Sequence, residues 1–126
     1  MSLTVSEHSA RHLRLILRSY LTSWGMDPLA DPAALALTEL VANVVRHVPD
    51  RRCTVLIQRR KQGVRVEVAD GNADLPPEEP PYPDGLAEGG RGLLLVDAVT
   101  DRWEVRPLPG GNGKTIWFEC DRDHDT

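Results

Sequence analysis

Four short motifs follow one another along the chain and hold the residues best suited to chemistry. They are Glu39-Leu40-Val41-Ala42-Asn43, Asp70-Gly71-Asn72, Gly90-Arg91-Gly92-Leu93 and Gly113-Lys114-Thr115. Together they supply a candidate general base, an oxygen ligand for a metal ion, a carboxylate for the edge of a base, a glycine-rich turn for phosphate groups and a hydroxyl. A site for a nucleoside triphosphate needs this combination. Each motif alone is common by chance, so the hypothesis depends on all four.

Glu39 and Asn43 stand four residues apart in a stretch whose apolar residues recur at helical spacing. The apolar positions share one broad arc of this helix and are Leu37, Leu40, Val41, Val44, Val45 and Val48. Glu39 and Asn43 lie on the opposite arc and reach the same spot, because residues four apart are neighbours on a helix. The Asn43 amide oxygen could ligate Mg²⁺, and the Glu39 carboxylate could accept a proton from a hydroxyl or water. From this helix alone, a solvated polar face is the favoured interpretation.

Asp70 ends a predicted strand in which valine occupies every second position from Val64. Asp70 has the parity of the valines, so we expect it on the covered side of the sheet. A carboxylate there needs a donor partner, and an exocyclic amine such as adenine N6 is suitable. The alternative is an aspartate that caps the following turn, with Gly71 and Asn72 supplying positive φ.

The glycine-rich segment from Gly89 to Gly92 precedes a predicted helix over residues 92–100. Glycines let the backbone approach phosphate oxygens, and the free N–H groups at a helix start favour an anion. Arg91 could add a charge-assisted contact. The alternative is a flexible hinge, and Leu93 also fits a core position.

Lys114 and Thr115 open the last predicted strand, over residues 115–120. The Thr115 hydroxyl could bond the base or an ordered water beside Asp70, and Lys114 could approach phosphates. The alternatives are a β-branched residue at a strand start and a solvated lysine in a hairpin, and the solvated lysine is the favoured one.

The elements that must position these residues follow the order α-α-β-β-lid-α-β-β. Helices are predicted over residues 6–24 and 31–47, with Asp31 as the cap of the second, and strands over 53–60, 64–70 and 103–108. Residues 71–91 form a lid too rich in proline for regular structure. This order predicts a two-layer α/β (α+β) sandwich with helices on one face of a mixed, mainly antiparallel sheet. We expect one domain over residues 1–126, with a frayed acidic tail at 121–126.

Composition narrows the function classes. The net charge of −4 argues against direct DNA binding, which needs a basic face. No apolar run approaches the roughly 18 residues needed to cross a membrane, and no signal peptide is visible, so we expect a cytoplasmic protein with no membrane partner. Cys53 and Cys120 are expected to be buried, reduced thiols.

Taken in order, residues 37–47, 66–70, 90–96 and 113–119 resemble the histidine-kinase-like ATPase superfamily, which has the Bergerat ATP-binding fold. Within it, the chain is most similar to the anti-sigma-factor serine/threonine kinases of actinobacteria. The resemblance implies the cofactors ATP and Mg²⁺. It also implies a phosphoacceptor anti-anti-sigma factor and a sigma factor as partners, and a homodimer.

The resemblance also implies roles for individual residues. Glu39 matches the general base, Asn43 the Mg²⁺ ligand, Asp70 the adenine-recognising carboxylate, and Thr115 the threonine near the adenine. Gly90 and Gly92 match the phosphate-binding glycines. The remaining residues expected at the nucleotide are Asn72, Arg91, Leu93 and Lys114.

One segment departs from the family pattern. The usual D-x-G-x-G reads here as Asp70-Gly71-Asn72-Ala73-Asp74. Asn72 tolerates left-handed geometry, whereas Asp74 near a triphosphate would be repulsive unless it points away. Two hypotheses therefore stay open: an ATP-dependent serine/threonine kinase, and a non-catalytic module that regulates a partner by contact. The catalytic half of a split histidine kinase is less favoured, because no helix pair carrying a phosphoacceptor histidine precedes the motifs.

Overall fold

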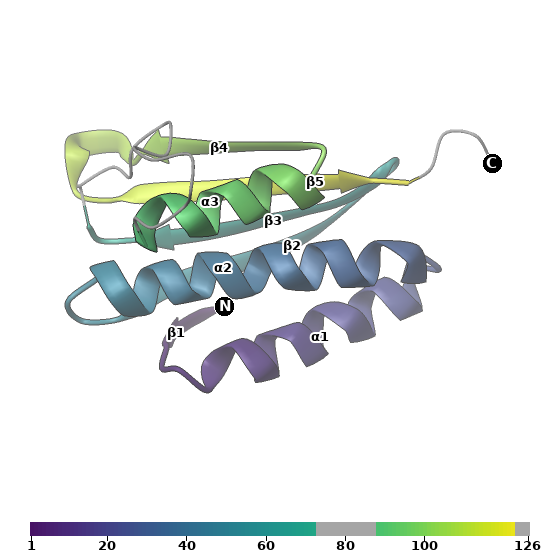
Figure 1. Ribbon diagram of the computed structural model, residues 1–126, viewed down its shortest axis with the longest axis horizontal. Helices are drawn as coiled ribbons and strands as arrows, with labels where there is room; N and C mark the ends of the chain where they lie inside the picture. Colours follow the sequence, from purple (N-terminus) through teal and green to yellow (C-terminus); the bar gives the residue numbers. More distant parts are fainter. Residues whose placement is uncertain (73–87, 123–126) are drawn as a thin grey trace.

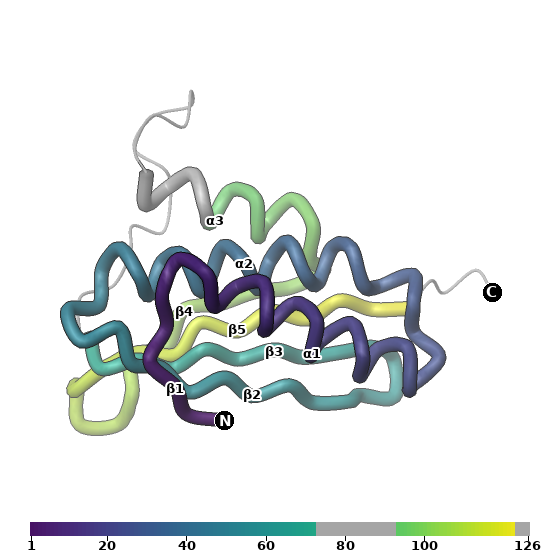
Figure 2. The backbone as a smooth tube through the Cα atoms, turned by 90° about the horizontal axis from the view of Figure 1, so that it is seen from below, coloured from purple at the N-terminus to yellow at the C-terminus, as the bar shows by residue number. Residues whose placement is uncertain are grey.

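The computed structural model describes residues 1–72 and 88–122. Within them, five strands form one sheet: β1 (Ser2–Thr4), β2 (Arg52–Arg60), β3 (Gly63–Asp70), β4 (Arg102–Pro107) and β5 (Lys114–Asp121). Three helices cover one face of the sheet: α1 (Ser9–Ser23), α2 (Ala30–His47) and α3 (Glu88–Val99) (Figures 1 and 2). Short 3₁₀ turns lie at Asp27–Leu29 and Pro109–Gly111.

The strand order is β1-β2-β3-β5-β4. Every described pair of neighbouring strands is antiparallel. The predicted two-layer architecture is therefore confirmed. The prediction was a mixed, mainly antiparallel sheet, and all described strand pairs are antiparallel. Residues 73–87 of the lid predicted over 71–91 lie outside the described residues. So do residues 123–126 of the predicted acidic tail.

The edge strand β1 was not predicted, because three residues are too short to show an alternating pattern. Leu3 pairs with Cys53 of β2. The amino group of Met1 donates a hydrogen bond to the carbonyl of Val55 at 2.8 Å. The start of the chain is thus fixed to the sheet by long-range pairing.

The core lies between the helix layer and the covered face of the sheet. Its largest contribution comes from α2, whose buried residues are Ala33, Ala34, Ala36, Leu37, Leu40, Val41 and Val44. Val66 of β3 and Phe118 of β5 are fully buried and face them. Cys53 and Cys120 are buried and free, as predicted.

All three helix starts differ from the sequence prediction. Helix α1 begins at Ser9, three residues after the predicted start at residue 6. Helix α2 begins at Ala30, directly after the 3₁₀ turn, and Asp31 pairs with Arg18 at 3.0 Å instead of capping the helix. Helix α3 begins at Glu88, four residues before the predicted Gly92. The glycines at 89, 90 and 92 hid this start, because glycine has a low helix propensity.

The segment Asp27–His47 is long and apolar enough to meet the length and composition of a membrane span, contrary to the expectation from sequence. In the folded chain it forms the 3₁₀ turn and α2, whose apolar residues pack in the core. A buried core helix accounts for this composition.

Candidate functional site

The segments that carry the four motifs converge toward one end of the molecule. Helix α2 ends there at His47, β3 ends at Asp70, and β5 begins at Lys114. Helix α3 packs against α2, begins at this end and runs antiparallel to it (Figure 1). Tertiary structure therefore brings together residues that are far apart in the chain: Lys114 meets Asp70 across 44 positions, and Asn72 meets His47 across 25.

Asp70 lies on the covered side of the sheet, as its parity with the valines predicts. Its side chain is 1% exposed, and that of Lys114 is 2% exposed. The Lys114 ammonium nitrogen Nζ lies 3.0 Å from Asp70 Oδ1 and donates a hydrogen bond to it. The backbone N–H of Asn72 donates to the same oxygen at 2.8 Å. Asp70 therefore caps the turn that follows it and also forms a buried ion pair.

The favoured interpretation of Lys114 as a solvated hairpin lysine is wrong. Lys114 stands directly opposite Asp70 in the β3–β5 ladder and shares the covered face with Ile116 and Phe118. An ammonium group loses its hydration there, so it must be paired to remain charged. Asp70 supplies that pair.

The expectation that Thr115 lies beside Asp70 is also wrong. Thr115 pairs with Ala69, whose side chain points to the opposite face from that of Asp70. Successive side chains of a strand alternate between faces, so Thr115 is directed away from the helix layer. Lys114 occupies the position beside Asp70 that was expected for Thr115.

Asn72 links the end of β3 to the end of α2. Its side-chain Nδ2 donates to the backbone carbonyl of His47 at 2.8 Å, and its own carbonyl accepts from Lys114 Nζ at 3.3 Å. The residue that replaces a glycine of the family pattern therefore has a structural role. It holds Asp70, Lys114 and the C-terminus of α2 in one hydrogen-bonded unit.

Gly113 permits the close approach of the β4–β5 loop to this unit. A Cβ atom at position 113 would lie 2.1 Å from the backbone oxygen of Asp70 and 2.9 Å from a methyl carbon of Leu108. Real Cβ atoms do not approach backbone that closely. The glycine before Lys114 is thus required by packing, independently of any ligand.

Glu39 and Asn43 lie on α2, both partly buried. Among the residues that the structure describes, neither side chain has a hydrogen-bond or ion-pair partner. Glu39 is eight positions before His47, so it lies about 12 Å along the helix from the Asp70 end. The described residues include no group of three or more His, Cys, Asp or Glu side chains that could hold a metal. A single amide ligand still suits Mg²⁺, which commonly keeps several waters and binds phosphate oxygens.

The third motif forms the first turns of α3, from Gly90 to Leu93. The first N–H groups of this helix belong to residues 88–91 and have no partner within the helix. Leu93 is buried, at 7% exposure, which fits the core position considered for it. The sequence placed the glycines before the helix, whereas the structure places Gly90 and Arg91 in its first turn.

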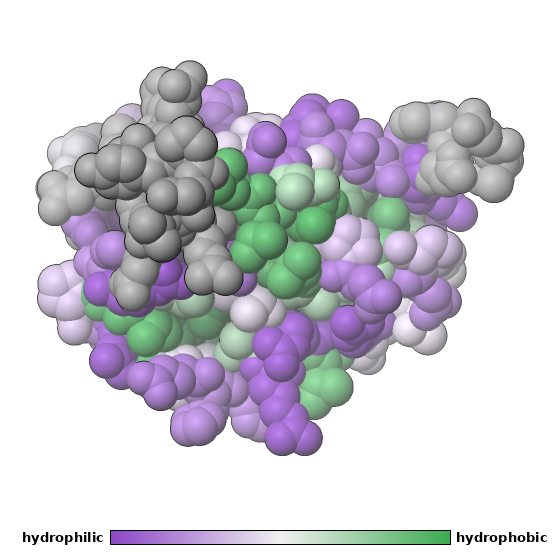
Figure 3. Space-filling model, viewed as in Figure 1, coloured by the Kyte–Doolittle hydropathy of each residue, from purple (hydrophilic) through white to green (hydrophobic). Residues whose placement is uncertain are grey.

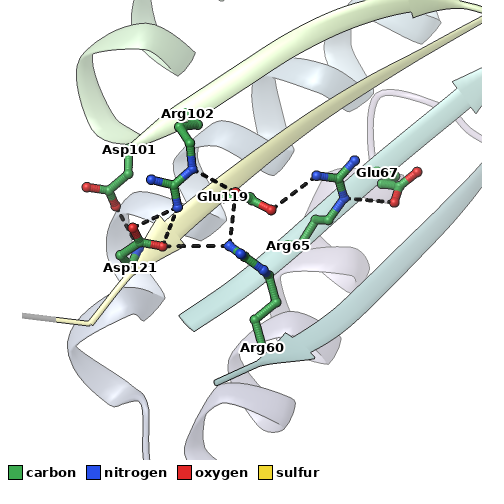
Figure 4. Close-up of polar contacts among 7 residues, drawn as sticks. All are labelled: Arg60, Arg65, Glu67, Asp101, Arg102, Glu119 and Asp121. Atoms are coloured by element: carbon green, nitrogen blue, oxygen red, sulfur yellow. Dashed lines mark hydrogen bonds and ion pairs between the residues drawn. The ribbon is translucent and has the colours of Figure 1, made fainter. Parts of the chain in front are cut away.

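The open face of the sheet carries a charged cluster that the sequence did not predict (Figure 4). Ion pairs join Glu119 to Arg60 at 2.9 Å, Arg65 at 3.1 Å and Arg102 at 2.8 Å, and its side chain is 8% exposed. Arg102 also donates to both carboxylate oxygens of Asp121 at 2.7 Å. Burial acts to raise the pKa of Glu119, but the hydrogen bonds from Arg102 and Arg65 and the charge of Arg60 outweigh it and lower that pKa. The cluster ties strands β2, β3, β4 and β5 together.

Known proteins resemble the chain in sequence family and in fold. Residues 3–119 match the family model of the histidine kinase-like ATPase domain. None of the curated proteins matches the chain. A chain in the crystal structure of the SiaB-SiaC complex from Pseudomonas aeruginosa superposes with a TM-score of 0.70 and 13% sequence identity. The match covers 94% of this chain and 88% of that one, so the two share a fold. With nearly its whole length matched by the family model, the chain belongs to the family of histidine kinase-like ATPase domains.

Proposed function

We propose that the chain is a cytoplasmic regulator that binds ATP with Mg²⁺ and transfers the γ-phosphoryl group to a serine or threonine of a protein partner. The observation that carries the proposal is the pair Glu39 and Asn43 on α2, whose side chains have no partner among the described residues. The helix ends at His47, which Asn72 links to the buried carboxylate of Asp70. Membership in a family of ATPase domains supports ATP as the ligand.

Each element would have a separate task. When bound, ATP with Mg²⁺ supplies the transferable phosphoryl group and the positive charge that neutralises its oxygens. The Asn43 amide oxygen would hold the metal ion, and the N–H groups of the first turn of α3, which have no partner within the helix, would face the phosphates. Glu39 would accept the proton of the attacking hydroxyl. Phosphoryl transfer depends mainly on positioning and charge, so a small domain suffices when its partner supplies the hydroxyl.

We infer two protein partners from the family resemblance: an anti-anti-sigma factor that accepts the phosphoryl group, and a sigma factor that the chain holds inactive. The similar solved structure comes from a complex of two proteins, which supports a protein-binding role. Apolar side chains also gather over α3 and the adjoining part of α2 (Figure 3). Among the exposed large apolar residues, Leu94 belongs to α3 and Leu35 to α2, at 40% and 39% exposure. An exposed apolar patch of this kind supports a contact with a partner or a second copy in a homodimer.

A second candidate function is a regulator that binds its partner without catalysis. The buried ion pair favours it, because Lys114 already satisfies one oxygen of the carboxylate that would read the base. In this case the nucleotide would bind weakly or have no effect on the partner.

Calorimetry of ATP binding, with and without Mg²⁺, tests the proposal. We expect binding that depends on Mg²⁺ in the wild type and is lost in Asn43→Ala. Gln58→Ala removes a similar amide from the exposed surface of β2 and is the matched control, for which binding is unchanged. If the wild type does not bind ATP at millimolar concentration, the kinase proposal is wrong and the non-catalytic regulator takes its place.

A further inference from the structure

We propose that Lys114 reads the nucleotide base directly, donating a hydrogen bond to N1 of adenine while the free oxygen of Asp70 accepts one from N6. The inference rests on the proposed function, because it specifies how the same site recognises its nucleotide. It adds Lys114 as a specificity-determining residue.

The buried pair leaves two hydrogen-bonding positions unused. Asp70 Oδ1 accepts from both Lys114 and Asn72, whereas Oδ2 accepts no hydrogen bond within the part of the chain that the structure describes. The Lys114 ammonium has three N–H groups. Two of them have acceptors, Asp70 Oδ1 and the backbone oxygen of Asn72, and the third has none among the described residues.

Burial makes these unused positions significant. The two side chains are only 1% and 2% exposed, so bulk water has little access to them. A buried charged group with an unmatched hydrogen-bonding position carries a desolvation penalty. A ligand that offers a donor beside an acceptor would match both positions at once and remove that penalty.

The Watson–Crick edge of adenine has this pattern. Its N6 amino group is a donor and the adjacent ring nitrogen N1 is an acceptor, so N6 would face Asp70 Oδ2 and N1 would face Lys114 Nζ. Guanine presents the reverse pattern, with the acceptor O6 beside the donor N1–H. An acceptor would then face the carboxylate and a donor would face the ammonium, which is unfavourable on both counts.

The surroundings hold the pair in a fixed position. Lys114 and Asp70 are cross-strand partners in the β3–β5 ladder. Asn72 bridges them to the C-terminus of α2, and the absence of a side chain at Gly113 lets the adjoining loop pack on the backbone of Asp70. A donor and an acceptor held by backbone pairing are pre-organised for one edge of a base, which favours specificity.

Nucleotide analogues test the inference on the wild-type protein. In 1-deaza-ATP a C–H group replaces N1, so only the proposed hydrogen bond from Lys114 is removed. In 7-deaza-ATP the N1 and N6 positions are intact. We expect 1-deaza-ATP to bind about 10- to 100-fold more weakly than ATP, since a hydrogen bond to a charged group is lost. Binding of 7-deaza-ATP should equal that of ATP, and GTP should bind more weakly than either.

The variant Lys114→Met provides the second arm. It keeps an unbranched side chain one heavy atom shorter and removes the ammonium, so ATP and 1-deaza-ATP should bind it equally. Lys61→Met changes an exposed lysine in the β2–β3 turn and should keep the wild-type difference. Circular dichroism establishes that each variant is folded, and the wild-type comparison needs no variant.

The outcomes separate the two proposals. If the wild type binds ATP and 1-deaza-ATP equally, or if Lys114→Met retains the difference, the role of Lys114 in base recognition is refuted and the pair is structural only. If the wild type binds none of the nucleotides, the proposed function itself fails, and the assignment of Lys114 fails with it.

Discussion

The Lys114 ammonium lies 3.0 Å from the Asp70 carboxylate, and both side chains are almost completely buried. The two residues are 44 positions apart in the chain and meet because β5 pairs with β3 in a register that sets them opposite each other. The pair therefore stabilises the contact between β3 and β5, and it also supplies two side chains of the candidate site.

Removing one member of this pair should destabilise the fold. Lys114→Met leaves a buried carboxylate without its partner, which typically costs about 3–5 kcal/mol. We expect a lower urea midpoint with an unchanged slope, measured by circular dichroism. Lys61→Met is the exposed control and should stay within about 0.5 kcal/mol of the wild type. The double variant Asp70→Asn/Lys114→Met should regain part of the loss, and a single variant as stable as the wild type would contradict this account.

Glu39→Ala should separate nucleotide binding from phosphoryl transfer. Loss of a general base lowers the rate by about 10²- to 10⁴-fold and leaves ATP affinity nearly unchanged. The measurement is transfer of labelled γ-phosphate to the protein partner, with Glu7→Ala, an exposed glutamate of the β1–α1 loop, as control. Transfer at the wild-type rate by Glu39→Ala would exclude Glu39 as the base.

Gly113→Ala should destabilise the protein more than Gly71→Ala. The added Cβ at position 113 would overlap the backbone oxygen of Asp70, at 2.1 Å, whereas a Cβ at position 71 meets its nearest atom among the described residues at 4.0 Å. Overpacking of this kind costs about 1–3 kcal/mol. Thermal unfolding of the two variants compares them directly, and equal midpoints would show that the loop moves away without cost.

Stability should fall in acid partly through Glu119. Its pKa in the folded chain lies below the ordinary value of 4.5, so the unfolded chain binds a proton at higher pH than the folded chain does. The stabilisation from Glu119 is therefore present above about pH 4.5 and is lost as the pH falls through the folded pKa. Glu119→Gln should lower stability at pH 7 and flatten its dependence on pH below 5, as measured by urea unfolding. An unchanged pH dependence would show that the three arginines do not favour the charged form.

The two thiols should resist labelling in the native protein. Burial raises the pKa of Cys53 to about 11, and burial raises the pKa of Cys120 to about 12. Because the thiolate is the reactive form, a disulfide reagent at pH 8 should react with neither until urea unfolds the chain. The raised values also predict a loss of stability as the pH rises above 9, the ordinary value for these thiols. Rapid labelling at pH 8 without denaturant would contradict the burial of these groups.

The sequence by itself determined the elements with strong periodicity. The apolar arc of α2 predicted the buried residues Leu37, Leu40, Val41 and Val44, and the valine alternation of β3 predicted the face on which Asp70 lies. Both follow from the repeat of the backbone, 3.6 residues for a helix and two for a strand, which is a local property. The placement of Glu39 and Asn43 on one edge of α2 has the same origin.

Only the tertiary structure decided what surrounds Asp70. The burial of Lys114 and the outward direction of Thr115 depend on the register of β5 against β3, and a shift of one residue would exchange their faces. The arginine charges around Glu119 of β5 likewise come from three other strands, β2, β3 and β4, which the sheet brings within ion-pair distance. Register is set by long-range packing and turn geometry, so a local pattern that marks Gly113-Lys114-Thr115 as one motif does not reveal which of its side chains reaches the carboxylate.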